Sequence, residues 1–122
     1  MVWGGGMRKH QELRVWQQTM DLVEHVYTLT KTFPDDETYG LTSQMRRSAV
    51  SVPSNIAEGA ARGSTQEFIR FLYISQGSLS ELETQLLIAQ RLNYLPDISL
   101  ALASINQASS QLGGLIKHLK NR

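Results

Sequence analysis

The chain has 122 residues, a length that fits one compact domain. Twelve lysines and arginines nearly balance eleven aspartates and glutamates, so the net charge of +1 excludes a strongly basic chain, and nucleic-acid binding would need a local patch. The absence of cysteine excludes disulfides, thiolate zinc sites and a cysteine nucleophile, and it fits a reducing compartment.

The N-terminal residues 1–7 contain three consecutive glycines, and we expect a flexible extension there. No apolar stretch is long enough for a signal peptide or a membrane span, so the sequence predicts a cytoplasmic protein without membrane association. The remaining residues, 8–122, are predicted to form a single domain.

Two helices are predicted in the first half of the domain. Residues 13–27 carry apolar side chains at alternating spacings of three and four, which is typical of a helix that packs along a long neighbour. Pro34 ends this pattern. A second helix is predicted to begin within residues 40–42, and Pro53 is expected to kink it rather than end it, because apolar spacing resumes at Ile56.

Two further helices are predicted in the second half. Ser64 and Glu67 have the spacing of a capping box, which predicts the start of a third, long helix. A short turn ends at Pro96, and Asp97 is expected to cap a fourth helix. Four long amphipathic helices with short links predict an all-α fold, an antiparallel up-and-down four-helix bundle.

The third helix has apolar side chains on more than one side. Only the line Arg70, Gly77, Thr84 and Arg91 is consistently non-apolar, and a helix of this kind is usually buried on several sides. We therefore predict a homo-oligomer. The alternative is that helices of the same chain cover these residues. The candidate interface residues are Phe71, Tyr73, Ile74, Leu87 and Ile88.

Patterns that carry catalysis or metal binding are not found in the sequence. His10, His25 and His118 lie far apart, and no Glu-x-x-His motif occurs, so no metal site is predicted. No phosphate loop, dinucleotide fingerprint or nucleophile elbow is present. We expect a protein that is not an enzyme and that uses no cofactor.

Basic residues offer a possible nucleic-acid surface. Each of them also has a simpler explanation, such as the Glu58–Arg62 pair at i,i+4, which adds only a little helix stability. An oligomeric ring would multiply any basic patch, and phosphate contacts made in this way would be salt-sensitive and largely independent of sequence. The candidate nucleic-acid-binding residues are Arg46, Arg47, Arg62 and Arg70.

Three stretches together resemble a known family. They are LRVWQ at 13–17, YGLTSQMRRSAVSVPSNIAEG at 39–59 and RGSTQEFIRFLYISQGSLSELETQL at 62–86. The chain resembles, over roughly residues 8–120, the four-helix-bundle proteins of the 23S rRNA-intervening sequence family. The resemblance implies a ring-shaped homopentamer. It also implies a relation to the accessory proteins of diversity-generating retroelements, which bind nucleic acid and the reverse transcriptase, and it supplies no catalytic residues.

The resemblance and the arginines together predict a non-enzymatic scaffold that associates with RNA or DNA. The alternative is a protein–protein adaptor without nucleic-acid binding, for which a reverse transcriptase is one possible partner. A third possibility, a bundle that binds a metal or a small molecule, would require a cluster of polar ligands inside the core. The number of subunits comes from the resemblance alone.

Overall fold

A computed structural model describes residues 9–122 of the protein. The predicted extension at 1–7 lies outside the described residues. The main elements are α1 (Arg14–Thr30), α2 (Leu41–Ala60), α3 (Thr65–Arg91) and α4 (Ser99–Lys120). Short 3-10 helices precede α1 and α2, namely η2 (Lys9–Glu12) and η3 (Asp35–Glu37).

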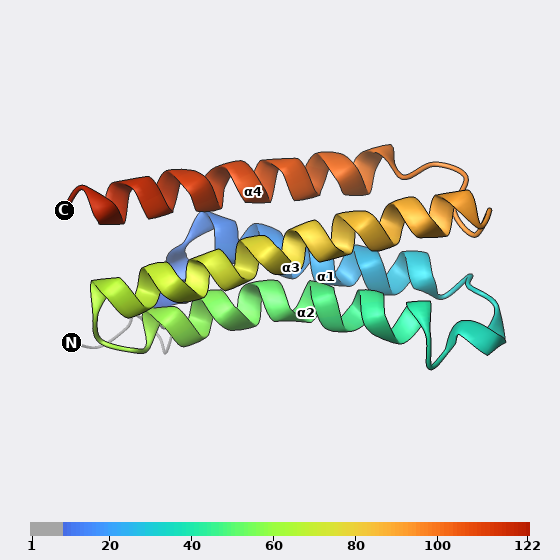
Figure 1. The fold of residues 1–122 in the computed structure, drawn as a ribbon, viewed down its shortest axis with the longest axis horizontal. Helices are drawn as coiled ribbons and strands as arrows, with labels where there is room; N and C mark the ends of the chain where they lie inside the picture. Colours follow the sequence, from blue (N-terminus) through green and yellow to red (C-terminus); the bar gives the residue numbers. More distant parts are fainter. Residues whose placement is uncertain (1–8) are drawn as a thin grey trace.

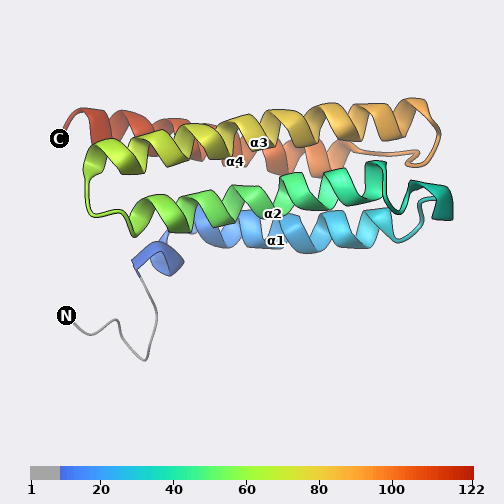
Figure 2. The ribbon, with the colours of Figure 1, turned by 60° about the horizontal axis from the view of Figure 1, so that its bottom comes forward.

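The four α-helices run alternately in opposite directions along one long axis (Figures 1 and 2). Each packs along the next, and α4 also packs against α1, which closes the bundle. The predicted all-α, up-and-down four-helix bundle is therefore confirmed. None of the helices in residues 9–122 is both long and apolar enough to cross a membrane.

The core runs the length of the bundle between the four helices. Its side chains recur every three or four residues along each helix, as the apolar periodicity predicts. Their burial provides the main stabilisation of the fold. The largest fully buried side chains include Met45, Val52, Ile56, Leu72, Leu79, Leu82, Leu86 and Leu112.

Helices α2 and α3 are joined by small polar side chains. Ser75 Oγ donates a hydrogen bond of 2.9 Å to the Val52 carbonyl, and the hydroxyls of Ser51 and Ser78 lie 2.9 Å apart. These bonds satisfy polar groups inside the interface, where an unpaired group would be costly. Helix α2 continues through Pro53 to Ala60, so the prediction that the proline does not end the helix is confirmed.

The predicted helix starts are close to the observed ones. Ser64 is the N-cap of α3, and its Oγ accepts a hydrogen bond of 3.1 Å from the Glu67 amide. Asp97 lies one residue before Ile98, the N-cap of α4. Its carboxylate accepts a bond of 2.9 Å from the Ser99 amide, which holds the pKa of Asp97 below its ordinary value.

Candidate functional site

The four candidate arginines fall into two pairs, one toward each end of α2. Arg46 and Arg47 lie near its start, whereas Arg62 follows its end and Arg70 lies in the first turns of α3. The helical rise between Arg47 and the end of α2 places the pairs about 20 Å apart. The structure therefore does not bring the four together into one patch.

One pair belongs to a region that we call the Phe71 end, made of Glu58, Arg62, Glu67, Arg70 and Phe71. Arg62 Nη2 lies 2.9 Å from Glu58 Oε2, and Arg70 Nε lies 3.0 Å from Glu67 Oε2. The two guanidinium carbons lie 5.0 and 4.5 Å from the centroid of the Phe71 ring. The Arg70 hydrogen bond is the main cause of a lowered pKa at Glu67. Both arginines are thus paired within their own chain.

Phe71 is buried, which differs from the predicted exposed position. It is 8% exposed, because α2 approaches closely at Gly59, where an added Cβ would lie 2.7 Å from Phe71 Cβ. Arg62 and Arg70 cover the ring from the solvent side. For Phe71, the alternative to an oligomer interface applies, because helices of the same chain bury this residue. Phe71 is therefore no longer an interface candidate.

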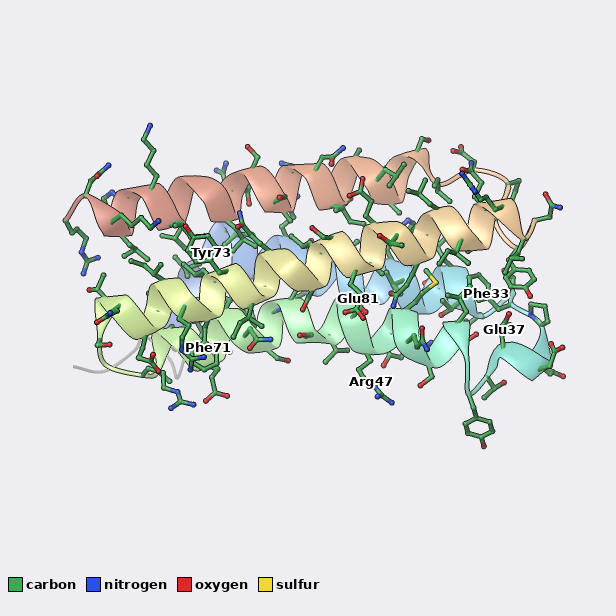
Figure 3. All side chains as sticks on the ribbon, viewed as in Figure 1. Phe33, Glu37, Arg47, Phe71, Tyr73 and Glu81 are labelled. Carbon is green, nitrogen blue, oxygen red and sulfur yellow. The ribbon has the colours of Figure 1, made fainter. Side chains whose placement is uncertain are left out.

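The other interface candidates remain exposed in the single chain. Ile74 and Ile88 are 39% and 42% exposed, and Gly77 between them has no atom within 4 Å of an added Cβ. Tyr73 lies between α3 and α4, where its hydroxyl accepts a bond of 2.7 Å from Lys120 (Figure 3). We call this surface the outer face of α3, and it consists of Tyr73, Ile74, Leu87, Ile88 and Leu92.

The second arginine pair lies in a pocket at the opposite end of the bundle, which we call the Tyr39 end. The pocket has a volume of about 460 Å³ and includes two cationic side chains and no carboxylate. The acidic η3 helix (Asp35–Glu37) is close in sequence but contributes nothing to the lining. The pocket is lined by Tyr27, Thr38, Tyr39, Thr42, Ser43, Arg46, Arg47 and Val50.

The two arginines of this pocket differ in how they are held. Arg46 Nε donates a bond of 2.9 Å to Thr30 Oγ1, and its guanidinium carbon lies 4.5 Å from the centroid of Tyr27. Arg47 is exposed and points away from the bundle (Figure 3). Within residues 9–122 the ion pairs are those of the Phe71 end. Arg46 is therefore positioned in advance, and Arg47 is available to a partner.

Glu37, which is labelled in Figure 3, anchors the loop that carries Tyr39 through two hydrogen bonds. Glu37 Oε1 accepts a bond of 3.1 Å from the Leu41 amide, and Oε2 accepts one of 2.8 Å from the Tyr94 hydroxyl. The bond from the Leu41 amide is the main cause that holds the pKa of Glu37 below its ordinary value, and the bond from Tyr94 adds to it. The Glu37 carboxylate in turn raises the pKa of Tyr94. Tyr39 itself is 97% exposed.

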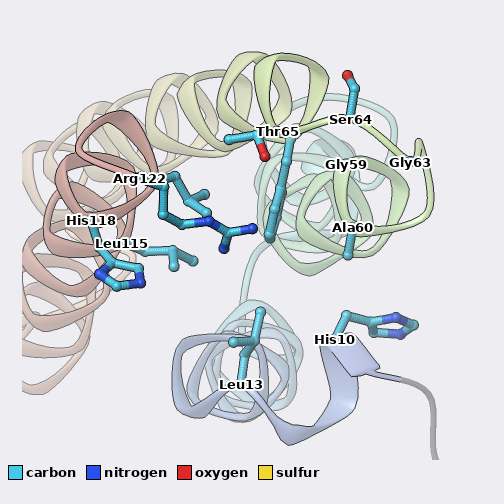
Figure 4. Close-up of a pocket in the computed structure, with 12 residues that line it drawn as sticks. His10, Leu13, Gly59, Ala60, Gly63, Ser64, Thr65, Leu115, His118 and Arg122 are labelled. Carbon is cyan, nitrogen blue, oxygen red and sulfur yellow. The ribbon is translucent and has the colours of Figure 1, made fainter.

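A second pocket, of about 420 Å³, lies near the Phe71 end and is mainly apolar (Figure 4). His10, His118 and Arg122 reach it from η2, α4 and the C-terminal residues (Figure 4). In the part of the chain that the structure describes, no three histidine or acidic side chains are grouped as metal ligands would be. The geometry thus directs attention to the Tyr39 end.

Comparison with protein families identifies the chain. The family model described as 23S rRNA-intervening sequence protein matches residues 11–117. The chain belongs to this family. The resemblance drawn from the sequence is confirmed at the family level, and the match includes both arginine pairs and the outer face of α3. A search of curated proteins finds no significant match.

In this member of the 23S rRNA-intervening sequence family, the sequence patterns did not indicate Tyr39 as a site residue. Tyr39 has no periodic apolar neighbours, because it lies in the loop before α2. A signal was present, since an aromatic residue at the end of a mainly polar loop precedes the Arg46–Arg47 pair by about two helical turns. Only the fold shows that all three residues line one pocket.

Proposed function

We propose that this member of the family is a non-enzymatic, nucleic-acid-associated scaffold that contacts phosphates through the Tyr39 end. The observation that carries the proposal is the pocket with Arg46 held in place, Arg47 unpaired and no carboxylate in the lining. Guanidinium groups bind phosphate through planar, bidentate hydrogen bonds. The near-zero net charge makes such a local patch the means of attracting a polyanion.

A binding titration with charge reversals tests this proposal. Labelled RNA and duplex DNA are titrated with the protein at low and moderate salt, and we expect binding that weakens as salt rises. Arg46→Glu with Arg47→Glu should abolish it. The matched pair Arg62→Glu with Arg70→Glu should reduce it much less, because those arginines already have carboxylate partners. No binding of the wild-type protein at low salt would reject the proposal.

We also propose that the scaffold is a homo-oligomer, for which the family resemblance suggests a pentameric ring. The outer face of α3 supports this, because it exposes five large apolar side chains, two toward the start of the helix and three toward its end, and exposed apolar surface favours a protein partner. A second copy of the chain is the partner we propose, because the same molecule also carries an apolar groove between α1 and α2. This groove measures about 330 Å³ and is lined by Trp16, Met20, Val23, Val50, Pro53, Ser54 and Ala57.

The presence of two different apolar surfaces favours a head-to-tail contact. When one surface of a subunit docks on a different surface of the next, repetition closes a ring if the rotation permits. Val50 lines both the groove and the arginine pocket. A ring assembled in this way would place one arginine pocket beside each subunit contact and repeat it around the ring, which strengthens binding to a long polyanion through avidity.

Light scattering tests the oligomer. Ile74→Glu or Ile88→Glu should lower the measured mass to that of one chain, while circular dichroism shows that the helices persist. Leu100→Glu is the matched control, because Leu100 is an exposed apolar residue of α4 and is not part of the outer face of α3. An unchanged mass for both isoleucine variants would show that these side chains are not at an interface.

The runner-up function is a protein adaptor, and an apolar surface open to a partner also favours it. A reverse transcriptase, as in the retroelement systems that the resemblance implies, is the partner to test first. A pull-down that recovers this partner after nuclease treatment would favour the adaptor. Loss of the partner after nuclease treatment would favour the nucleic-acid scaffold.

A further inference from the structure

The side chain of Tyr39 is the most exposed of the large apolar residues in the described chain. Aromatic side chains usually bury much of their surface, because this is their largest contribution to stability. The loop below Tyr39 is nevertheless firmly attached, since Glu37 bonds both the start of α2 and Tyr94. An aromatic ring is thus held in solvent by an anchored loop, beside a pocket that contains two arginines.

We propose that the Tyr39 end binds an unpaired nucleotide of a single-stranded nucleic acid, with its base stacked on Tyr39 and its phosphate held by Arg46 and Arg47. This inference rests on the proposed function and names the form of nucleic acid that the site takes. It assigns to Tyr39 a role that the arginines alone do not require.

The pocket has the dimensions and the groups that a nucleotide needs. Its volume of about 460 Å³ lies within the usual range of small-ligand sites. Arg46 is held by Thr30 and by the ring of Tyr27, so little freedom is lost when it meets a phosphate. The hydroxyl of Ser43, also in the lining, can donate to a phosphate or sugar oxygen.

An unpaired strand fits this arrangement better than a duplex does. In a duplex, neighbouring base pairs cover the faces of each base, whereas single strands leave bases free to stack on aromatic side chains. Such stacking tolerates any base, because every base has a π-face. RNA and DNA strands share this chemistry, so the site is predicted to accept an unpaired nucleotide of either kind.

Anisotropy titrations with four probes test the inference. The probes are one short labelled RNA strand, the DNA strand of the same sequence, and the duplex of each. Tyr39→Ala should weaken single-strand binding about tenfold or more, the loss typical of one stacked base, and should change duplex binding less than about twofold. Tyr39→Phe keeps the ring and should restore the affinity. The ratio of RNA to DNA affinity shows which strand the site prefers.

The outcomes separate this inference from the function on which it rests. Unchanged single-strand affinity in Tyr39→Ala, together with a loss in Arg47→Ala, would overturn the inference and leave the proposed function standing. An equal loss for single strands and duplexes would also overturn it. Absence of binding by the wild-type protein would overturn both and favour a protein ligand. Because Tyr39 is almost fully exposed, thermal unfolding of Tyr39→Ala should match that of the wild type.

Discussion

The two ends of α2 use the same residue types in opposite ways. At the Phe71 end, two arginines lie over a buried aromatic ring, and each has a carboxylate within one helical turn. At the Tyr39 end, two arginines line a pocket without a carboxylate, and an aromatic ring stands in solvent. The count of arginines is equal at both ends, so the surroundings decide which pair is available to a polyanion.

The difference arises from how closely the neighbouring backbone approaches. Gly59 lets α3 come close enough for Phe71 to be covered. At the other end, the chain leaves α1 and passes through η3, which lies beyond the ends of the helices (Figure 2). Tyr39 follows η3 in this connection and is almost fully exposed. The close packing at the Phe71 end contributes to stability, whereas the Tyr39 end leaves its arginines and its aromatic ring available to a ligand. Each of the predictions that follow alters one side of this comparison.

The largest effect is expected for the free energy of unfolding at the Phe71 end. Gly59→Ala would place a Cβ 2.7 Å from Phe71 Cβ and 3.3 Å from the carbonyl oxygen of Phe68. We expect this overpacking to lower the free energy of unfolding by about 1–3 kcal/mol. Urea unfolding followed by circular dichroism measures it.

Gly114→Ala is the matched control for this substitution. It makes the same change on the open side of α4, where no atom lies within 4 Å, and should raise the free energy of unfolding by about 0.5–1 kcal/mol. If both variants gained stability, the close contact between α2 and Phe71 would leave room for a side chain at Gly59, and the prediction would be wrong.

The second effect concerns the salt dependence of nucleic-acid binding. Arg47→Ala should weaken binding and lower the slope of log affinity against log salt by about one, because one phosphate contact is lost. Arg62→Ala should leave the slope nearly unchanged, since Glu58 already neutralises Arg62. Titrations over a series of salt concentrations measure both slopes. Equal slopes in the two variants would remove the functional distinction between the two ends.

Much of the fold was predictable from local patterns, and this includes part of the Phe71 end. The ion pair of Glu58 with Arg62 and the cap formed by Ser64 depend on residues three or four apart in sequence, so spacing alone indicates them. The same local reasoning placed Phe71 on the surface. It could not register the approach of α2 at Gly59, which depends on packing between helices.

The Tyr39 end was harder to predict, because its contacts join distant parts of the chain. Glu37 meets Tyr94 across 57 residues, and Arg46 reaches back 16 residues to Thr30. No helical period encodes such pairs. The sequence analysis identified Arg46 and Arg47 by their charge, but the loop that presents Tyr39 beside them becomes visible only when α1, α2 and the α3–α4 turn are placed together.

A third, smaller effect is expected when the anchor of the Tyr39 loop is titrated. The Leu41 amide and the Tyr94 hydroxyl hold the pKa of Glu37 below its ordinary value of 4.5. A carboxylate with a lowered folded-state pKa stabilises the fold above its unfolded pKa, and this contribution is lost as the pH falls through the folded pKa. The urea midpoint of the wild type should therefore exceed that of Glu37→Gln at neutral pH, and the difference should shrink in acid.

Two measurements make the test of Glu37 specific. Urea midpoints of wild type and Glu37→Gln are compared at neutral pH and at a pH well below the ordinary value. Tyr94→Phe removes one of the two bonds, so its own difference from wild type should also shrink in acid, because protonation of Glu37 weakens that bond. A difference between wild type and Glu37→Gln that stays constant with pH would show that the ionised carboxylate is not what holds the loop.

The smallest effect on stability, and the sharpest contrast between the ends, comes from freeing Arg62. Glu58→Gln removes an exposed i,i+4 ion pair and should cost only about 0.3–0.5 kcal/mol in unfolding free energy. It should nevertheless raise affinity for a phosphate-bearing strand, because Arg62 becomes available. Glu24→Gln on the exposed side of α1 changes the net charge equally. A larger gain for Glu58→Gln would show that the local carboxylate silences Arg62, whereas equal gains would mean that net charge alone governs binding.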